Sequence, residues 1–260
     1  MSTPSILLVP GSFSLPEFYD EVVRAVKAGG IDVEALHLPS VGVASGLGRE
    51  GTPPSMYDDA AFIAERTTKL ADEGREVIIV AHSYGGVPAS ESAKGMSKSD
   101  RQQQGKQGGL VRIAYITALV PAVGSAALDV LASIPQDRRP ELTIEGNGWM
   151  VHLPRNSAAI VFSGLPREEG EAWIRRFPQH SAVSFTSPLT HAGYLDVPVS
   201  YLVCEDDLTI PVDTQREGIG MVERESGTKV DVTTIKTDHC PMASAPHLMV
   251  NWIMRLATQG

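Results

Sequence analysis

The chain has 260 residues, of which 42% are hydrophobic and 20% are charged, so it can bury one large core. Its formal net charge of −9 argues against nucleic-acid binding, which needs a basic surface. No apolar run approaches the roughly 20 residues that a membrane span requires. The 2 cysteines imply no disulfide framework. With no recognisable leader, we expect a cytoplasmic protein that binds neither nucleic acid nor a membrane.

Short apolar runs alternate with helix-compatible segments along most of the chain. The apolar positions of these runs are nearly continuous, which is typical of parallel strands buried on both faces. The alternation predicts an α/β fold, with a mostly parallel sheet and helices on both faces. We expect strands at Ser5–Val9, Ile31–Leu36, Glu76–Ala81, Val111–Ala118, Val199–Cys204 and Val230–Ile235. We expect helices at Leu15–Ala28, Tyr57–Glu73, Val87–Met96, Val212–Val222 and Ala245–Leu256.

Two regions interrupt this alternation. Lys98–Gly109 is polar and rich in Gln and Gly, which favours a surface loop. Residues 122–190 show no clear strand period and contain several prolines and an amphipathic piece at Glu168–Phe177. We therefore expect a core formed by 1–121 and 191–260, with 122–190 inserted as a small helical cap.

The sequence Ala-His-Ser-Tyr-Gly-Gly at 81–86 joins an apolar run to a helix-compatible segment. It matches the strand–nucleophile–helix turn G-x-S-x-G, with Ala81 in place of the first Gly. Small residues are needed on both sides of the serine because strand and helix approach closely there. The motif makes Ser83 the candidate nucleophile, and a Gly-rich loop around an ordinary serine is the alternative.

A serine hydroxyl needs a base within hydrogen-bond reach. His239 suits this role because it lies between the last apolar run and the final helix. We expect His82, which flanks Ser83, to point away from it and to pack or form hydrogen bonds. The remaining histidines are expected to be surface, cap or helix-start residues: His37, His152, His180, His191 and His247.

The base in turn needs a carboxylate that orients it. Three acidic residues in a row, Glu205, Asp206 and Asp207, close an apolar strand, and spacing alone does not choose among them. Asp238, beside His239, is expected to form a turn.

An oxyanion formed during acyl transfer needs two preorganised N–H donors. We expect one from the backbone of Tyr84, which follows the candidate nucleophile. The other is expected from Ser12, in the loop after the first strand. Gly11 permits a tight turn in that loop, and Pro10 has no N–H to donate.

Residues 238–246, Asp-His-Cys-Pro-Met-Ala-Ser-Ala-Pro, resemble the signature D-H-M-P-M-x-S-x-P. This signature is typical of the α/β-hydrolase branch that holds plant methyl-ester esterases and hydroxynitrile lyases. Residues 205–211, followed by Gln215, resemble the E-x-D-x-x-x-P…Gln of the same branch, a register that implies Asp207 as the acid. The resemblance spans nearly the whole chain and is weakest in the cap. Lys98–Gly109 and the segment 185–189 are more similar to microbial, fungal-type relatives.

Two departures from that branch bear on the chemistry. The esterases have His-Gly after the first strand, where this chain has Pro10 and Gly11. The lyases have Thr at the position of Gly11 and Lys directly after the catalytic His, where this chain has Cys240. A lyase uses that Lys charge to hold departing cyanide, so its absence argues against cyanohydrin cleavage.

The resemblance implies an α/β-hydrolase that cleaves a carboxylic ester or lactone. Ser83 would attack the carbonyl, His239 would transfer the proton, Asp207 would orient the imidazole, and the Ser12 and Tyr84 amides would bind the oxyanion. No metal or organic cofactor is implied. The substrate is expected to be small and apolar, and a homodimer remains one possible oligomeric state. The cap should line an apolar pocket, for which the candidates, each equally compatible with plain core, are Trp149, Met150, Phe162, Leu165 and Trp173.

Three other functions remain open at this stage. The same triad could serve lactonisation, C–C cleavage or elimination in a secondary-metabolite route, because the triad itself does not select the acyl group. The fold could also serve as a ligand receptor or as a catalytically silent scaffold.

Overall fold

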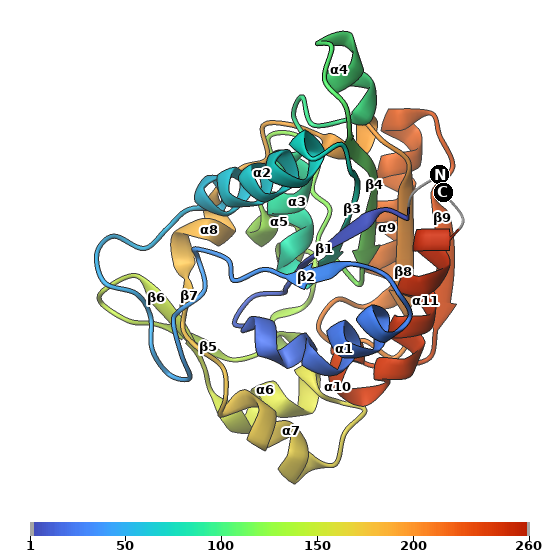
Figure 1. Cartoon of the computed structure of the whole chain (residues 1–260). Coiled ribbons are helices and arrows are strands. Elements are labelled where there is room, and N and C mark those ends of the chain that lie inside the picture. The colour runs from blue at the N-terminus through green and yellow to red at the C-terminus, as the bar shows by residue number, and fades with distance from the viewer. Residues whose placement is uncertain (1–2, 259–260) are drawn as a thin grey trace.

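The computed structural model describes residues 3–258, apart from the side chains of 154 and 155. Its centre is a six-stranded sheet of order β2-β1-β3-β4-β8-β9, in which every neighbouring pair is parallel (Figure 1). The predicted α/β class is confirmed, and each expected strand is present. The strands are β1 (Ser5–Val9), β2 (Val33–Ala35), β3 (Glu76–His82), β4 (Gly109–Ile116), β8 (Val199–Cys204) and β9 (Asp231–Ile235).

Helices cover both faces of this sheet. The strand order reverses between β1 and β3, and right-handed crossovers then place the helix that follows β1 on the face opposite to the helices that flank β3. Helix α1 packs with α11 on one face, and α2 packs with α3 on the other. The helices outside the insertion are α1 (Asp20–Ala28), α2 (Met56–Asp72), α3 (Gly86–Ser92), α4 (Lys98–Gln103), α9 (Val212–Ser226), α10 (Pro241–Ser244) and α11 (Pro246–Thr258). None of the helices within residues 3–258 combines the length and the apolar composition needed to cross a membrane.

The segment Lys98–Gly109 differs from its expected loop conformation. Its first part forms helix α4, and its last residue begins β4. The hydroxyl of Ser97 accepts a hydrogen bond from the Asp100 amide at 3.0 Å and so caps the helix. The buried Arg101 pairs with Asp72 at 2.6 Å and fixes the helix to the end of α2. The polar composition therefore reflects a capped surface helix.

The segment between β4 and β8 is a mixed insertion, and its strands were not predicted. It contains an antiparallel sheet of order β5-β6-β7 beside several short helices (Figure 1). An isolated bridge from Val41 to His180 joins this sheet to the segment after β2. The strands are β5 (Leu142–Ile144), β6 (Trp149–His152) and β7 (His180–Ser181). The helices are α5 (Ala127–Ala132), α6 (Pro154–Val161), α7 (Arg167–Ile174) and α8 (Ala182–Thr186). Across residues 3–258, the 3-10 turns are η1 (Pro16–Tyr19), η2 (Ser83–Gly85), η3 (Gln136–Arg138) and η4 (Gly193–Leu195).

The carboxyl ends of the parallel strands lie at one edge of the sheet, beneath the insertion. The crevice where strand order reverses, between β1 and β3, is where open α/β sheets bind ligands. The loops after β1 and β3 meet there, and the loops after β8 and β9 approach from the neighbouring strands. These four loops carry the candidate nucleophile, base, acid and oxyanion donors of the sequence analysis.

Candidate active site

Ser83 lies at the sharp turn between β3 and α3. Its φ is +53°, a left-handed conformation that non-glycine residues adopt rarely and that is typical of a strained turn. A Cβ at Gly85 would lie 2.5 Å from the carbonyl oxygen of Pro10, so only glycine fits the close approach to the loop after β1. The turn thus requires glycine at the position where the motif has its second glycine.

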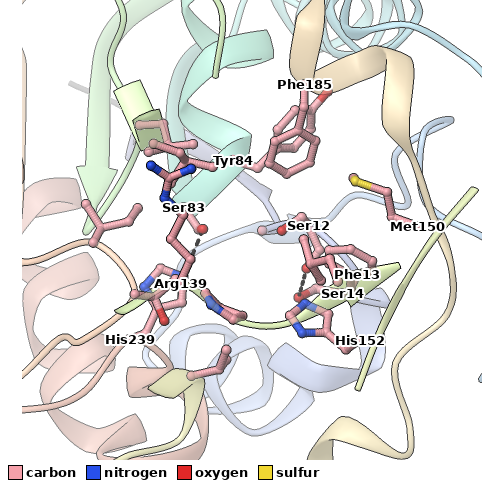
Figure 2. Close-up of a pocket in the computed structure, with 18 of the residues that line it drawn as sticks. Ser12, Phe13, Ser14, Ser83, Tyr84, Arg139, Met150, His152, Phe185 and His239 are labelled. Carbon is pink, nitrogen blue, oxygen red and sulfur yellow. Dashed lines mark hydrogen bonds between the residues drawn. The ribbon is translucent and has the colours of Figure 1, made fainter. Parts of the chain in front are cut away.

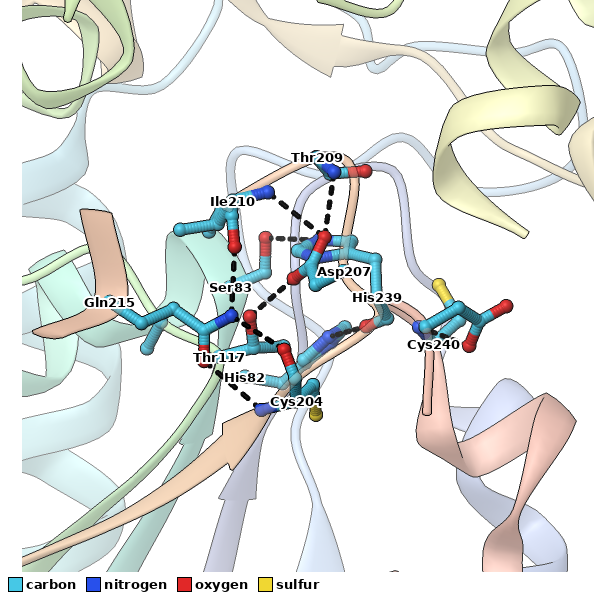
Figure 3. Close-up of polar contacts among 12 residues, drawn as sticks. His82, Ser83, Thr117, Cys204, Asp207, Thr209, Ile210, Gln215, His239 and Cys240 are labelled. Atoms are coloured by element: carbon cyan, nitrogen blue, oxygen red, sulfur yellow. Dashed lines mark hydrogen bonds and ion pairs between the residues drawn. The ribbon is translucent and has the colours of Figure 1, made fainter. Parts of the chain in front are cut away.

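The structure brings the side chains of Ser83, His239 and Asp207 into one hydrogen-bonded line (Figure 3). Nδ1 of His239 lies 2.7 Å from Oδ2 of Asp207, and Nε2 lies 2.9 Å from Oγ of Ser83. A carboxylate only accepts, so Nδ1 carries the proton and Nε2 accepts from the serine hydroxyl. All three residues are at most 6% exposed, so water competes little for these bonds.

The structure distinguishes Asp207 from its two acidic neighbours. Glu205 and Asp206 are exposed, whereas Asp207 is buried. Its Oδ1 accepts from the amides of Thr209 at 2.6 Å and Ile210 at 2.9 Å. Oδ2, besides facing His239, accepts from the hydroxyl of Thr117 at the end of β4, a partner that the sequence analysis missed (Figure 3). Four donors therefore fix the carboxylate.

Gln215 fixes the loop that presents this carboxylate. Its side-chain amide donates to the carbonyl oxygens of Cys204 at 2.9 Å and Ile210 at 2.8 Å. Its Oε1 accepts from the Cys204 amide at 3.1 Å. One buried glutamine on α9 thus closes both ends of the loop after β8.

The loop after β1 leaves one backbone donor free among the described residues. The Gly11 amide donates to the hydroxyl of Tyr19 at 3.2 Å, and the Phe13 amide donates to Nδ1 of His180 at 3.3 Å. Between them, the Ser12 amide has no acceptor among the described residues. The Tyr84 amide lies in the first turn of a helix, where backbone donors lack intrahelical partners. Both residues line the same cavity as Ser83 (Figure 2).

The side chain of His82, next to the nucleophile in sequence, forms its hydrogen bonds with residues other than Ser83. Its Nε2 donates to the backbone carbonyl of His239 at 2.7 Å, so its Nδ1 accepts from the hydroxyl of Tyr19, also at 2.7 Å. Burial, with a contribution from His239, lowers the pKa of His82 to about 3. His82 is therefore a neutral side chain that forms hydrogen bonds.

Asp238 does more than form a turn. Its Oδ1 accepts from the Cys240 amide at 3.1 Å and from the hydroxyl of Ser244 at 2.6 Å. Its Oδ2 accepts from the Gly164 amide at 2.9 Å, in the insertion between α6 and α7. The residue beside His239 thus ties the insertion to the core.

A cavity of about 460 Å³ opens above Ser83 between the core and the insertion (Figure 2). Of the five cap residues considered in the sequence analysis, Met150 lies on its wall, and Trp149 and Phe162 belong to the buried interior. Leu165 and Trp173 are partly buried against the core. The apolar wall includes Leu119, Leu128, Leu131, Leu142, Ile144, Met150, Val161, Phe177, Val183, Phe185 and Ile210.

Two cap histidines have roles that were not expected from the sequence. His180 is fully buried, accepts from the Phe13 amide and lies 3.0 Å from the hydroxyl of Ser184. His152 forms part of the cavity wall, with Nδ1 2.7 Å from the hydroxyl of Ser157. Burial lowers the pKa of each to about 3, so both are neutral near pH 7. Their neighbours come from distant segments, which sequence spacing does not reveal.

Residues 3–258 contain no group of three or more His, Cys, Asp or Glu side chains placed so that they could hold a metal ion. Cys204 and Cys240 are both buried free thiols. Burial raises the pKa of Cys240, whose thiol therefore stays neutral beside His239.

Comparison with known proteins defines the class of this chain. The alpha/beta hydrolase family matches residues 6–252, and the chain belongs to that family. It is 30% identical over 258 residues to "Probable hydrolase R7" of a Phoma species, a match that covers 99% of both chains. It is 28% identical over 198 residues to Methylesterase 9 of Arabidopsis thaliana, covering 70% of this chain and 71% of the relative. The resemblance to plant methylesterases is thereby confirmed.

The same fold is found in a solved structure of a bacterial protein. The crystal structure of a pyrethroid hydrolase from Sphingobium faniae JZ-2 superposes with a TM-score of 0.74 and covers 98% of each chain. Its sequence identity to this chain is 20%, so the match shows the shared fold.

Proposed function

We propose that this protein hydrolyses a carboxylic ester or lactone through an acyl-enzyme formed on Ser83. The observation that carries the proposal is the buried hydrogen-bonded line from Ser83 through His239 to Asp207, at the floor of an apolar cavity. A serine, a base and an orienting carboxylate in this order are the parts that acyl transfer needs.

In the first half of the reaction, Oγ of Ser83 attacks the substrate carbonyl while its proton passes to Nε2 of His239. Asp207 holds the Nδ1 proton and stabilises the imidazolium. The carbonyl oxygen becomes an oxyanion, which the Ser12 and Tyr84 amides bind. When the tetrahedral intermediate collapses, the leaving alkoxide takes the proton from Nε2 and departs as the alcohol.

In the second half, water attacks the acyl-enzyme and gives its proton to Nε2 of His239. A second oxyanion forms in the same place and collapses. Oγ of Ser83 regains the proton, and the carboxylic acid is released. Every proton transfer uses the same nitrogen, so the cycle needs no further acid or base.

The cavity favours a small, largely apolar substrate. A volume of about 460 Å³ is in the usual range for small-molecule sites. We propose that residues 122–190 act as a cap, because β5, α5 and α8 supply much of the apolar wall. The names of the relatives, a hydrolase and a methylesterase, agree with ester cleavage.

The test combines covalent labelling with turnover. A fluorophosphonate probe should label the wild-type protein, and mass spectrometry should place the label on Ser83. Ser83→Ala should abolish both the labelling and the hydrolysis of p-nitrophenyl acetate, with kcat reduced by several orders of magnitude. Ser133→Ala, at an exposed serine just after α5, is the control and should retain both. Label on another residue, or full turnover by Ser83→Ala, would refute the proposal.

A further inference from the structure

Arg139 is an unusual member of the cavity wall. Among the described residues that line the cavity, it is the one with a permanently charged side chain, and the others are mainly apolar (Figure 2). It follows the 3-10 turn η3 in the insertion and is partly buried. No described Asp or Glu forms an ion pair with it. The cavity therefore contains a cation that has no carboxylate partner within the part of the chain that the structure describes.

The guanidinium of Arg139 is held in place along one edge. Its Nε donates to the carbonyl oxygen of Ile134 at 2.7 Å, and its Nη2 donates to that of Ala132 at 3.0 Å. These bonds use two of the five N–H donors of an arginine side chain. The donors that remain lie on Nη1 and on the rest of Nη2, the far end of the guanidinium. That end has the fork geometry that binds a carboxylate through two parallel hydrogen bonds.

The surroundings strengthen the attraction of this end for an anion. Apolar walls lower the local dielectric, so a charge pair inside the cavity is screened less than one on an open surface. The two neutral histidines on the wall, His82 and His152, have pKa values lowered to about 3 and add no positive charge near pH 7. Because two backbone carbonyls already orient the side chain of Arg139, little conformational entropy is lost when a ligand binds.

We propose that Arg139 binds a carboxylate of the substrate, remote from the carbonyl that Ser83 attacks. The substrate class is then an apolar ester or lactone that carries a free carboxylic acid, such as a monoester of a dicarboxylic acid. This inference rests on the proposed function for the bond that is cleaved, but the anion site itself does not depend on turnover.

A structural role for Arg139 predicts a different result. Arginine side chains near a helix C-terminus often bind its last carbonyls, and Ala132 ends α5. If Arg139 only braced α5, its loss would weaken the binding of all substrates alike. Binding of a carboxylate instead predicts a loss confined to substrates that bear one.

The experiment compares matched esters in matched variants. The substrates are p-nitrophenyl hydrogen adipate and p-nitrophenyl hexanoate, with the shorter and longer members of both series, so that only the terminal carboxylate differs within a pair. The variants are Arg139→Met, Arg139→Lys and the control Arg138→Met, which changes the exposed neighbouring arginine outside the cavity wall.

We expect the wild type to favour one acid-bearing ester over its neutral partner. Arg139→Met should raise KM for that ester by roughly 10- to 100-fold and leave KM for the neutral ester within about twofold, as expected for loss of a charge-assisted pair. Arg139→Lys should restore part of the preference, since it keeps the charge without the fork. Arg138→Met should match the wild type.

A second arm measures binding without catalysis. Monomethyl adipate and methyl hexanoate, of which only the first carries a carboxylate, are titrated by calorimetry into Ser83→Ala and into Ser83→Ala with Arg139→Met. The inference predicts that monomethyl adipate binds more tightly than methyl hexanoate, and that the added Arg139→Met change removes this difference. Equal affinities for monomethyl adipate in the two proteins, or equal KM changes for both esters, would overturn it. If the wild type cleaves none of the esters, the proposed function fails, and the titration still decides the role of Arg139.

Discussion

The hydroxyl of Tyr19 donates a hydrogen bond of 2.7 Å to Nδ1 of His82, a pair that links two loops of the site. On one side, Tyr19 accepts from the Gly11 amide in the loop after β1. On the other side, His82 donates to the carbonyl of His239 in the loop after β9. The position of the proposed oxyanion donor and that of the proposed base therefore depend on the same two buried side chains.

Removal of the Tyr19 hydroxyl should weaken both stability and turnover. Tyr19→Phe leaves the Gly11 amide and Nδ1 of His82 without partners in a buried place, at a cost of about 1–3 kcal/mol in the free energy of unfolding. We expect kcat to fall severalfold while KM changes less. Urea unfolding and ester kinetics measure the two effects. Tyr57→Phe, whose hydroxyl bonds at the surface, is the control, and equal losses in both variants would contradict this linkage.

Substitution of Asp206, Asp207 and Asp238 should separate the three acids sharply. Asp207→Asn should lower kcat roughly a thousandfold or more, because an amide stabilises the wrong imidazole tautomer. Asp206→Asn and Asp238→Asn should lower it far less, the latter through the loop geometry that Asp238 maintains. The measurement is steady-state hydrolysis of p-nitrophenyl acetate. A larger loss in Asp206→Asn would place the acid one residue away.

The hydroxyl of Thr117 should contribute to catalysis through Asp207. Thr117→Val keeps the shape of the side chain and removes the hydroxyl that donates to Oδ2. A hydrogen bond to a charged group contributes about 1.5–3 kcal/mol, so kcat should fall roughly 10-fold or more. Thr117→Ser retains the hydroxyl and should stay near the wild-type rate. Equal rates in the two variants would show that the bond has no effect on the reaction.

Stability should decrease as the pH falls below about 6.5. Burial lowers the pKa of His82, His152 and His180 to about 3, against an ordinary value near 6.5 in the unfolded chain. Between these values the unfolded state binds more protons, so the free energy of unfolding declines with falling pH. Asp59 acts in the opposite sense, since burial raises its pKa to about 6. Burial also lowers the pKa of His37, so this one carboxyl stands against four histidines.

Urea unfolding at neutral pH and at about pH 5 measures this dependence. His180→Gln removes one titrating group and should give a shallower dependence on pH, even if it also lowers stability at neutral pH. A free energy of unfolding that rises on acidification would reverse the predicted sign.

Cyanohydrin cleavage should be negligible beside ester hydrolysis. Cys240 lies on the cavity wall as a neutral thiol, so it cannot hold departing cyanide as a lysine ammonium would. A Cβ at Gly11 would lie 3.0 Å from Nδ1 of His82 and 3.1 Å from Cβ of Ser83. Gly11→Thr with Cys240→Lys should therefore lower ester turnover through crowding. The assays are cyanide release from mandelonitrile and hydrolysis of p-nitrophenyl acetate; comparable rates with the two substrates would contradict the prediction.

The central sheet could be predicted from sequence because burial on both faces leaves a nearly continuous apolar run. Ser5–Val9 and Val199–Cys204 form β1 and β8 with the expected bounds. Strand β5 could not be found in this way, since its three residues are exposed and it is stabilised by a partner strand. Helix α4 did have a local signal, the Ser-x-x-Asp pattern from Ser97 to Asp100, which the polar composition concealed.

The proposed catalytic residues could be predicted to different degrees for a related reason. Ser83 lies in a turn whose requirements are local, and its motif shows them directly. The acid could not be chosen by spacing, because the partner that distinguishes it, Thr117, comes from another strand. Arg139 gave no signal at all, since a lone arginine in a polar stretch looks like any solvated surface residue.

The bond from the Gly164 amide to Asp238 makes the two halves of the insertion unequal. The half with α6 and α7 is hydrogen-bonded to Asp238, the residue next to His239. An outward movement of this half would therefore disturb the position of the base. On the other half, Leu142 and Ile144 of β5 line the cavity and are 40% and 66% exposed. Leu128 of α5 and Val183 of α8 also line the cavity and are both 46% exposed. The most exposed apolar part of the cavity wall therefore lies on β5, α5 and α8, apart from the segment that bonds to Asp238.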